Sequence, residues 1–201
     1  MAKHYPGSSI TSVSNSHSQR EYVLGEARKR GLDNLEVLTE DVNAFVTDST
    51  YDRLVSVEMF EHVRNHRELF RRIHSWLNPG GKLFTHVFCH RSTSYPFEVD
   101  GEDDWMSTHF FSGGTMPADE LFLRICGSLE LEKRWRWSGT HYARTSEHWL
   151  ENIDREKESI LRLFQKDLAL AEAHRTYHRW RMFFLACAET FGFAGGQEWW
   201  V

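Results

Sequence analysis

The order in which strand-like and helix-like segments follow one another constrains the fold of this chain most strongly. Four β-prone runs are expected as strands, at Ser8–Ser14, Leu35–Asp41, Tyr51–Met59 and Lys82–His90. Helical patterns lie between them at Ser16–Arg30, which Gly31 would terminate, and at His66–Leu77. Strands that alternate with helices predict an α/β protein with a parallel sheet and right-handed crossovers.

The second half of the chain departs from this alternation. Residues 91–127 are rich in loop-forming residues and aromatic rings, and such a long connection is expected to be a lid or substrate-binding insertion. A period-two pattern predicts a further strand at Leu129–Ser138, and helices are expected at Ser146–Phe164 and Asp167–Phe191. We expect residues 1–201 to form one partial domain, with a helical segment over residues 146–191.

Composition narrows the classes of function. The 201 residues are 40% hydrophobic and 26% charged, which is typical of a globular domain with a buried core. A net charge of -5 gives no general electrostatic reason to bind nucleic acid or an anionic membrane. Three scattered cysteines, Cys89, Cys126 and Cys187, predict neither a disulfide framework nor a metal site, and favour a reducing cytoplasm. The sequence shows neither an apolar leader nor a run of membrane-spanning length.

Three ionisable side chains gather where the strand at Tyr51–Met59 ends. Glu58 lies three residues before Glu61 and four before His62, so a helical turn would bring them to one face. Ligands of open α/β sheets bind at the carboxyl ends of the strands, which favours a site here. The alternative interpretation is that the two carboxylates only stabilise the positive end of a helix.

Two other patterns have ordinary structural explanations. Ser16 and Gln19 have the spacing of a helix capping box, although hydroxyl and amide groups at such a turn could also hold a ribose. Arginine alternates with aromatic residues in "RWRW" at 134–137 and "HRWR" at 178–181. This resembles nucleic-acid platforms weakly, and strand and helix periodicity explains it better.

Several longer stretches resemble one enzyme family in the same order along nearly the whole chain. They are "ITSVSNSHSQREYV", "YDRLVSVEMFEHV", "NPGGKLFTHVFCH", "DDWMSTHFFSGGTMP", "HYARTSEHWL" and "QEWWV". They resemble the cyclopropane-fatty-acid-synthase-like methyltransferases that use S-adenosylmethionine, and in particular the coclaurine N-methyltransferase branch. The resemblance implies a Rossmann-like class I methyltransferase sheet with helices on both faces.

The resemblance also implies roles for individual residues. The cofactor ribose would contact Ser14 and Gln19, and the adenine would lie near Asp41 and Val42. The methyl-acceptor site would comprise Glu58, Glu61 and His62. Tyr142 in "HYART" matches an active-site tyrosine of the lipid-modifying members.

One difference within the family bears on the substrate. Cyclopropane synthases typically carry glycine where this chain has Glu58, whereas the amine methyltransferases carry glutamate, so a small amine is the expected acceptor. Methyl transfer from a sulfonium needs an aligned, deprotonated amine, and His62 beside two carboxylates is expected as the base. Stacking on an aromatic or cationic acceptor is expected from Trp105, Phe110 and Phe111.

The resemblance further implies that the family's glycine-rich first strand and most of its last strand lie outside this chain. The chain alone is therefore expected to be a weak or inactive enzyme. Methyl transfer to an unsaturated acyl lipid is the alternative reaction, and a non-catalytic remnant or interaction subunit is the alternative class. The sequence leaves a homodimer open.

Overall fold

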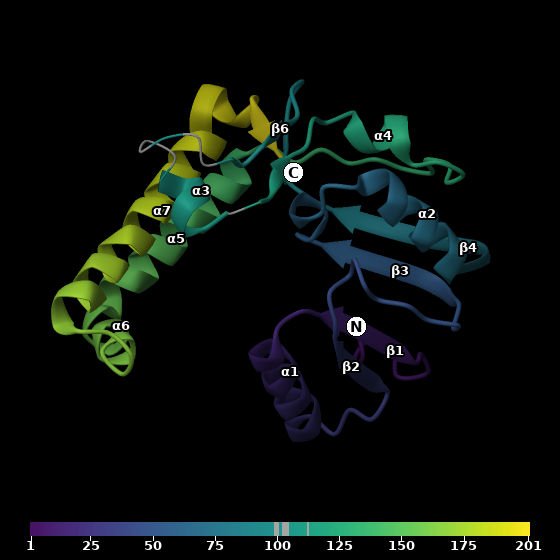
Figure 1. Ribbon diagram of the computed structural model, residues 1–201, viewed down its shortest axis with the longest axis horizontal. Helices are drawn as coiled ribbons and strands as arrows, with labels where there is room; N and C mark the ends of the chain where they lie inside the picture. Colours follow the sequence, from purple (N-terminus) through teal and green to yellow (C-terminus); the bar gives the residue numbers. More distant parts are fainter. Residues whose placement is uncertain (99–100, 102–104, 112) are drawn as a thin grey trace. The chain divides into compact units, whose positions relative to one another are not determined.

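The computed structural model describes residues 1–98, 101, 105–111 and 113–201, and the chain divides into two compact units (Figure 1). The first unit comprises Met1–Thr50 and the second Tyr51–Val201. The described strands form four separate two-stranded sheets, of which two are parallel and two antiparallel. Mixed α/β structure is thus confirmed.

The first unit is a strand, a helix and a second, parallel strand. Strand β1 (Ile10–Ser14) pairs with β2 (Leu35–Thr39), and helix α1 (His17–Lys29) connects them. The three expected elements are confirmed with small shifts of their ends. Strand β1 begins at Ile10 rather than Ser8 because the Asn34 side-chain amide donates to the carbonyls of Ala2, Tyr5 and Ser8, which holds the preceding residues in turns.

Both ends of α1 follow from local signals in the sequence. Ser16 caps the first turn by accepting from the Gln19 amide at 3.3 Å. Gly31 has a φ of 63°, and the next residue, Leu32, donates to the carbonyl of Ala27. This six-to-one bond is the Schellman arrangement, which needs a residue that tolerates positive φ.

The second unit begins with another parallel pair. Strand β3 (Tyr51–Val57) pairs with β4 (Leu77–His86), helix α2 (His66–Trp76) connects them, and Figure 1 shows both arrowheads at the same edge. The expected strand at Lys82–His90 divides, because β4 ends at His86 and the short β5 (Cys89–His90) pairs with β8 (Trp199–Trp200).

The two faces of the β3–β4 pair differ in burial. Ser56 is buried, whereas Val55, Val57 and Phe84 on the opposite face are 43%, 57% and 40% exposed. Register partners across the pair are Val55 with Phe84 and Val57 with His86, so these four residues share a face.

The segment at 91–127 contains short elements. They are β6 (Tyr95–Pro96), which pairs with β7 (Thr115–Met116), and helices α3 (Trp105–His109) and α4 (Leu121–Ile125). Part of this segment, at 99–100, 102–104 and 112, lies outside the described residues. Its role as a lid or substrate loop stays a prediction.

The prediction of a strand at Leu129–Ser138 is wrong, because the structure has no strand there. Among the described residues, its backbone pairing with other segments is limited to two bonds between Trp137 and Val201 and a bridge from Ser138 to Trp200. A strand requires a neighbour along its length, and here the neighbour reaches only the end of the segment. Leu131 and Trp135 consequently remain exposed.

Three helices complete the second unit. They are α5 (Thr140–Arg155), α6 (Lys157–Phe164) and α7 (Leu170–Gly196), and α5 and α7 lie side by side in Figure 1. The expected helix at Ser146–Phe164 is divided at Glu156 into α5 and α6, and α5 starts six residues before Ser146. The expected helix at Asp167–Phe191 is confirmed as α7, which starts at Leu170 and continues past a kink at Phe193–Gly195. Cys187 and Phe191 of α7 are buried, and Trp180 on the same helix is partly exposed.

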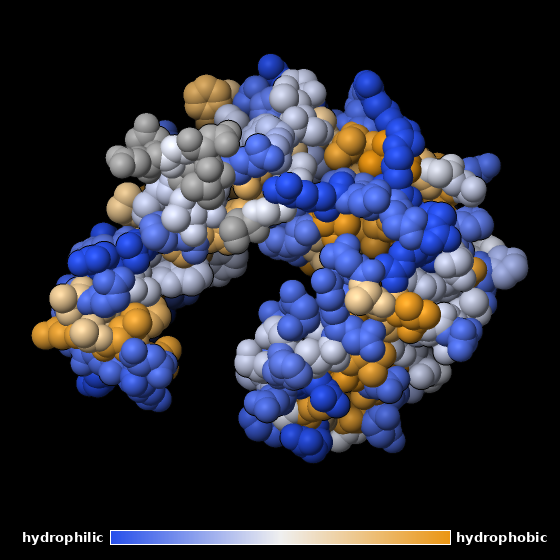
Figure 2. All heavy atoms as spheres, viewed as in Figure 1, coloured by the Kyte–Doolittle hydropathy of each residue, from blue (hydrophilic) through white to orange (hydrophobic). Residues whose placement is uncertain are grey.

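Some large apolar side chains lie on the surface. Figure 2 shows apolar surface around the turn between α6 and α7, where Leu163 and Leu170 are both exposed. Within the described residues, no helix combines the length and apolarity needed to cross a membrane.

Candidate active site

The backbone turns sharply where β3 ends. Glu58 directly follows the strand and has a φ of 49°, in the left-handed region that residues other than glycine rarely adopt. Its amide donates to the carbonyl of His86 at 2.9 Å, so the parallel ladder continues for one residue beyond Val57. Such strain in a non-glycine residue is found preferentially at functional sites.

The side chains of Glu58 and His86 are also joined. Nδ1 of His86 lies 2.8 Å from Oε1 of Glu58, and both groups are partly buried. Burial raises the pKa of the Glu58 carboxyl, while the charge and hydrogen bond of His86 act in the opposite direction. Sequence reasoning missed His86, and its position at the end of the neighbouring parallel strand was the available signal.

Glu61 lies in a short 3₁₀ turn, η1 (Phe60–His62), and is 2% exposed. Burial raises the pKa of its carboxyl to about 8, and the nearby charge of Glu58 adds to the shift. Its Oε2 atom is buried and has no hydrogen-bond partner among the residues that the structure describes. A three-residue turn provides little helix dipole, so the dipole interpretation does not explain why a carboxylate is buried here.

His62 is the most accessible member of the group. Its side chain is 56% exposed, and Nε2 lies 4.0 Å from Oε1 of Glu61. The imidazole lies parallel to the ring of Phe111, with centroids 6.0 Å apart and an interplanar angle of 8°. His62 thus connects a buried carboxyl group to an aromatic surface.

Tyr142 approaches the same carboxylates from α5. Burial raises the pKa of its phenol, and the charges of Glu58 and Glu61 add to that effect. Its ring stacks on Phe191 with centroids 4.2 Å apart. The structure therefore brings together the four residues expected to be catalytic, from the residue after β3, from η1 and from α5.

The three expected substrate-contacting aromatic residues are divided between two environments. Phe111 contacts His62 and also packs against the core cluster that contains Phe88 and Phe191. Phe110 stacks on Phe183 of α7 at 4.5 Å, and Trp105 lies 5.2 Å from Phe110. The aromatic surface thus extends from His62 towards α7.

The residues expected around the cofactor all lie in the first unit. Ser14 and Gln19 are joined by a 2.7 Å bond between Oγ and Oε1, and the Ser16 amide donates to Ser14 Oγ at 3.2 Å. The capping box is therefore only half formed, because Gln19 binds Ser14 instead of reaching back to the amide of Ser16.

The second pair of expected cofactor residues follows β2. Asp41 Oδ1 accepts from the backbone and side-chain amides of Asn43 at 2.8 and 2.9 Å, and Val42 lies within this turn. The Glu40 amide donates to the carbonyl of Ser14 at 3.0 Å. Ser14 and the start of this turn are thus neighbours at the carboxyl ends of β1 and β2.

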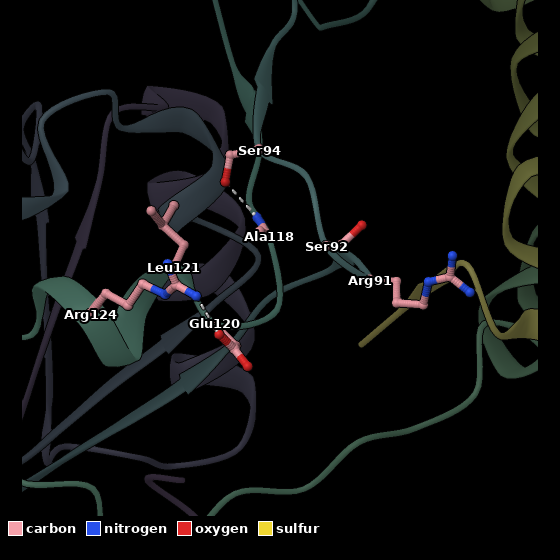
Figure 3. A pocket seen from close by; sticks show the side chains of 7 residues that line it. All are labelled: Arg91, Ser92, Ser94, Ala118, Glu120, Leu121 and Arg124. Atoms are coloured by element: carbon pink, nitrogen blue, oxygen red, sulfur yellow. Dashed lines mark hydrogen bonds and ion pairs between the residues drawn. The ribbon is translucent and has the colours of Figure 1, made fainter.

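A separate cavity of about 370 Å³ lies elsewhere in the second unit. It is lined by Arg91, Ser92, Ser94, Ala118, Glu120, Leu121 and Arg124. Figure 3 shows the Arg91 side chain extending away from the other labelled side chains, and Arg124 binds Glu120 at 2.7 Å. The two guanidinium groups do not converge on a common ligand position.

The arginine–aromatic patterns have partners within the chain. The guanidinium of Arg136 lies 4.4 Å from the ring centroid of Trp200, and Arg181 binds both oxygens of Asp154. No metal-binding group of histidine, cysteine and carboxylate side chains occurs among the residues that the structure describes.

Comparison with known proteins identifies the family. The model of the mycolic acid cyclopropane synthetase family matches residues 1–196. The chain belongs to this family. Its members are S-adenosylmethionine-dependent methyltransferases, as the resemblance in the sequence predicted.

Within the family, the chain is similar to alkaloid N-methyltransferases of plants. It is 38% identical to (S)-coclaurine N-methyltransferase of Thalictrum flavum subsp. glaucum, over 99% of this chain and 56% of that protein. The corresponding enzyme of Papaver somniferum is 32% identical, over 94% of this chain and 55% of that protein. The chain thus spans somewhat more than half the length of these relatives.

Solved structures support the fold assignment. Coclaurine N-methyltransferase bound to N-methylheliamine and SAH matches with a TM-score of 0.92 and 34% identity, over 99% of this chain and 60% of that one. The cyclopropane synthase MmaA2 of Mycobacterium tuberculosis matches with a TM-score of 0.73 and 22% identity, over 90% of this chain and 65% of that one. The second likeness concerns the fold alone.

Proposed function

We propose that the whole protein transfers a methyl group from S-adenosylmethionine to the nitrogen of a small, alkaloid-like amine. The observation that carries this proposal is the convergence of Glu58, Glu61 and His62 beside an aromatic surface. The Glu58 carboxylate, when ionised, attracts an ammonium group, and aromatic faces bind cations. The continuous Rossmann-like sheet with helices on both faces, in one domain, remains part of this proposal.

The chemistry requires a base and an aligned acceptor. An ammonium has no free electron pair, so the amine must lose its proton before its nitrogen can attack the methyl group. His62 is placed to take that proton because its imidazole is accessible and close to Glu61. Glu58 holds the cationic nitrogen beside the imidazole, and Phe111 limits the positions that the acceptor can take.

The first unit offers groups that fit the cofactor. Serine hydroxyl, carboxamide and carboxylate groups are suitable partners for ribose hydroxyls and for adenine, and Ser14, Gln19 and Asp41 supply them at one sheet edge. Val42 provides an apolar neighbour for the adenine ring. When bound, S-adenosylmethionine supplies an activated methyl group on its sulfonium.

Methyl transfer to an unsaturated acyl lipid is the second candidate, and Glu58 favours the amine. A carboxylate at this position, held by His86, suits a cationic acceptor and would disfavour an apolar chain. The amine-methylating relatives in plants support the same choice.

A competition assay with labelled S-adenosylmethionine tests the proposal. The whole protein is offered a benzylisoquinoline secondary amine together with vesicles of unsaturated phospholipid, and label is expected in the amine. Label only in lipid would exclude amine methylation as the function.

Two substitutions test the site itself. We expect Glu58→Gly and His62→Ala each to lower turnover by roughly 10²- to 10⁴-fold while the affinity for S-adenosylmethionine stays close to normal. Glycine is chosen at position 58 because the backbone there has positive φ. The exposed Glu147→Gln serves as a control, and near-normal kinetics in both site variants would refute the assignment.

A further inference from the structure

The direction of the Glu58 side chain does not follow from regular strand geometry. Side chains alternate between faces along a strand, so a regular continuation would place Glu58 on the face opposite to Val57. Val57 and His86 are register partners and share a face. A regular strand would therefore direct Glu58 away from His86.

The left-handed turn at Glu58 changes this direction. With a φ of 49°, the residue leaves the strand while its amide still bonds to the His86 carbonyl. The carboxylate then lies 2.8 Å from Nδ1 of His86. An unfavourable backbone conformation is thus combined with one specific side-chain contact, and backbone strain persists only where the surroundings determine it.

We propose that His86 is the positioning residue for Glu58, holding the ionised carboxylate through Nδ1 so that its second oxygen can receive the acceptor's ammonium. The part of this inference that concerns the acceptor's ammonium rests on the proposed function. The effect of His86 on the Glu58 carboxylate does not depend on it. An ionised carboxylate only accepts hydrogen bonds, so Nδ1 of His86 carries the proton in this pair. The ring of Trp137, 5.5 Å from the imidazole centroid, packs beside His86.

The other charged groups around Glu58 give His86 a distinct task. Glu61 from η1 and Tyr142 from α5 both interact electrostatically with Glu58. Each of these two groups is negative when it ionises, so neither stabilises a negative charge on Glu58. His86 is the neighbour that favours the carboxylate form. Its removal should therefore make Glu58 easier to protonate.

The test follows the Glu58 carboxyl by carbon NMR in the 201-residue chain as pH is varied. In His86→Ala the titration midpoint should move to higher pH by about one unit, the size expected for loss of a hydrogen bond to a charged group. His86→Asn should reverse much of this shift, because the asparagine amide can donate from nearly the same position. His74→Ala, on the exposed face of α2, is the matched control.

The outcomes separate this inference from the proposed function. An unchanged Glu58 midpoint in folded His86→Ala, or a midpoint in His86→Asn that is displaced as far as in His86→Ala, overturns the positioning role. A shifted midpoint, with the acidic limb of amine methylation by the whole protein moving in the same direction, supports it. A shifted midpoint in a protein that methylates no amine supports the positioning role and refutes only the proposed function.

Discussion

The imidazole of His62 and the ring of Phe111 lie parallel, with centroids 6.0 Å apart. They come from different parts of the second unit, since His62 ends η1 and Phe111 follows α3. Phe111 also contacts Phe88, Phe97 and Phe183, so these rings hold the Phe111 side chain in place beside His62. The orientation of the proposed base therefore depends on aromatic packing as well as on Glu61.

Shortening Phe111 should weaken this orientation. We expect Phe111→Ala to lower kcat/KM for the amine by about two- to tenfold, because an aromatic pair contributes about 0.5–1.5 kcal/mol beyond its buried area. Phe111→Tyr retains the ring and should keep most of the activity. Steady-state kinetics with both variants measure the effect, and equal losses in the two would exclude ring stacking as the cause.

The buried carboxyl of Glu61 predicts how stability depends on pH. Its pKa rises from 4.5 to about 8 on folding, so between these values the folded chain holds a proton that the unfolded chain has released. The contribution of Glu61 to stability is therefore largest at low pH and declines as pH rises to about 8. The slope is at most about 1.4 kcal/mol per pH unit.

Replacing Glu61 by glutamine should remove this dependence. We expect Glu61→Gln to gain stability relative to the native chain as pH rises from 5 to 8, with no further gain above that range. Thermal unfolding across this range measures the difference, and Glu147→Gln is the exposed control. A pH-independent difference would mean that Glu61 is ionised at all these pH values.

Hydrogen bonding at the start of α1 gives a prediction for the first unit. The Ser16 cap contributes about 1 kcal/mol in typical helices, so in Ser16→Ala the amide of Gln19 should exchange its hydrogen about fivefold faster. Ser14→Ala removes the bonds to Gln19 and to the Ser16 amide but leaves the cap itself. Hydrogen-exchange NMR should therefore show a smaller effect at Gln19 in Ser14→Ala.

Local signals explain which parts of the fold could be predicted from the sequence. Ser16 and Gly31 mark the ends of α1 by themselves, and Asn65 caps α2 by accepting from the Glu68 amide. The strand at Leu129–Ser138 could not be judged in this way. Its alternation was clear, but a strand also depends on a distant backbone partner, and within the described part of the chain only Trp137 and Ser138 have one.

The candidate site shows the same division. Glu58, Glu61 and His62 are close in sequence, so their grouping could be predicted from spacing. His86 joins them only because the register pairs Val57 with His86 and because Glu58 turns out of the strand. Neither the register nor the positive φ can be read from the sequence, since a glutamate gives no sign of a left-handed conformation.

The junction that starts α5 gives a last prediction. A Cβ added at Gly139 would collide with the carbonyl oxygens of Trp199 and Phe191, which belong to backbone that cannot easily move away. Gly139 immediately precedes the helix that carries Tyr142, and its amide donates to the Gly196 carbonyl at 3.0 Å. We expect Gly139→Ala to destabilise the second unit by about 2 kcal/mol or more.

Gly192→Ala is the matched control for this substitution. Its added Cβ would meet only Ala143 Cβ, at 3.7 Å, which is an ordinary contact. The control should therefore be neutral or slightly stabilising, because alanine restricts the unfolded chain more than glycine does. Denaturant unfolding of both variants decides the matter. Equal stability in the two would show that the backbone around Gly139 can rearrange, and Tyr142 would then depend on Phe191 rather than on this junction for its position.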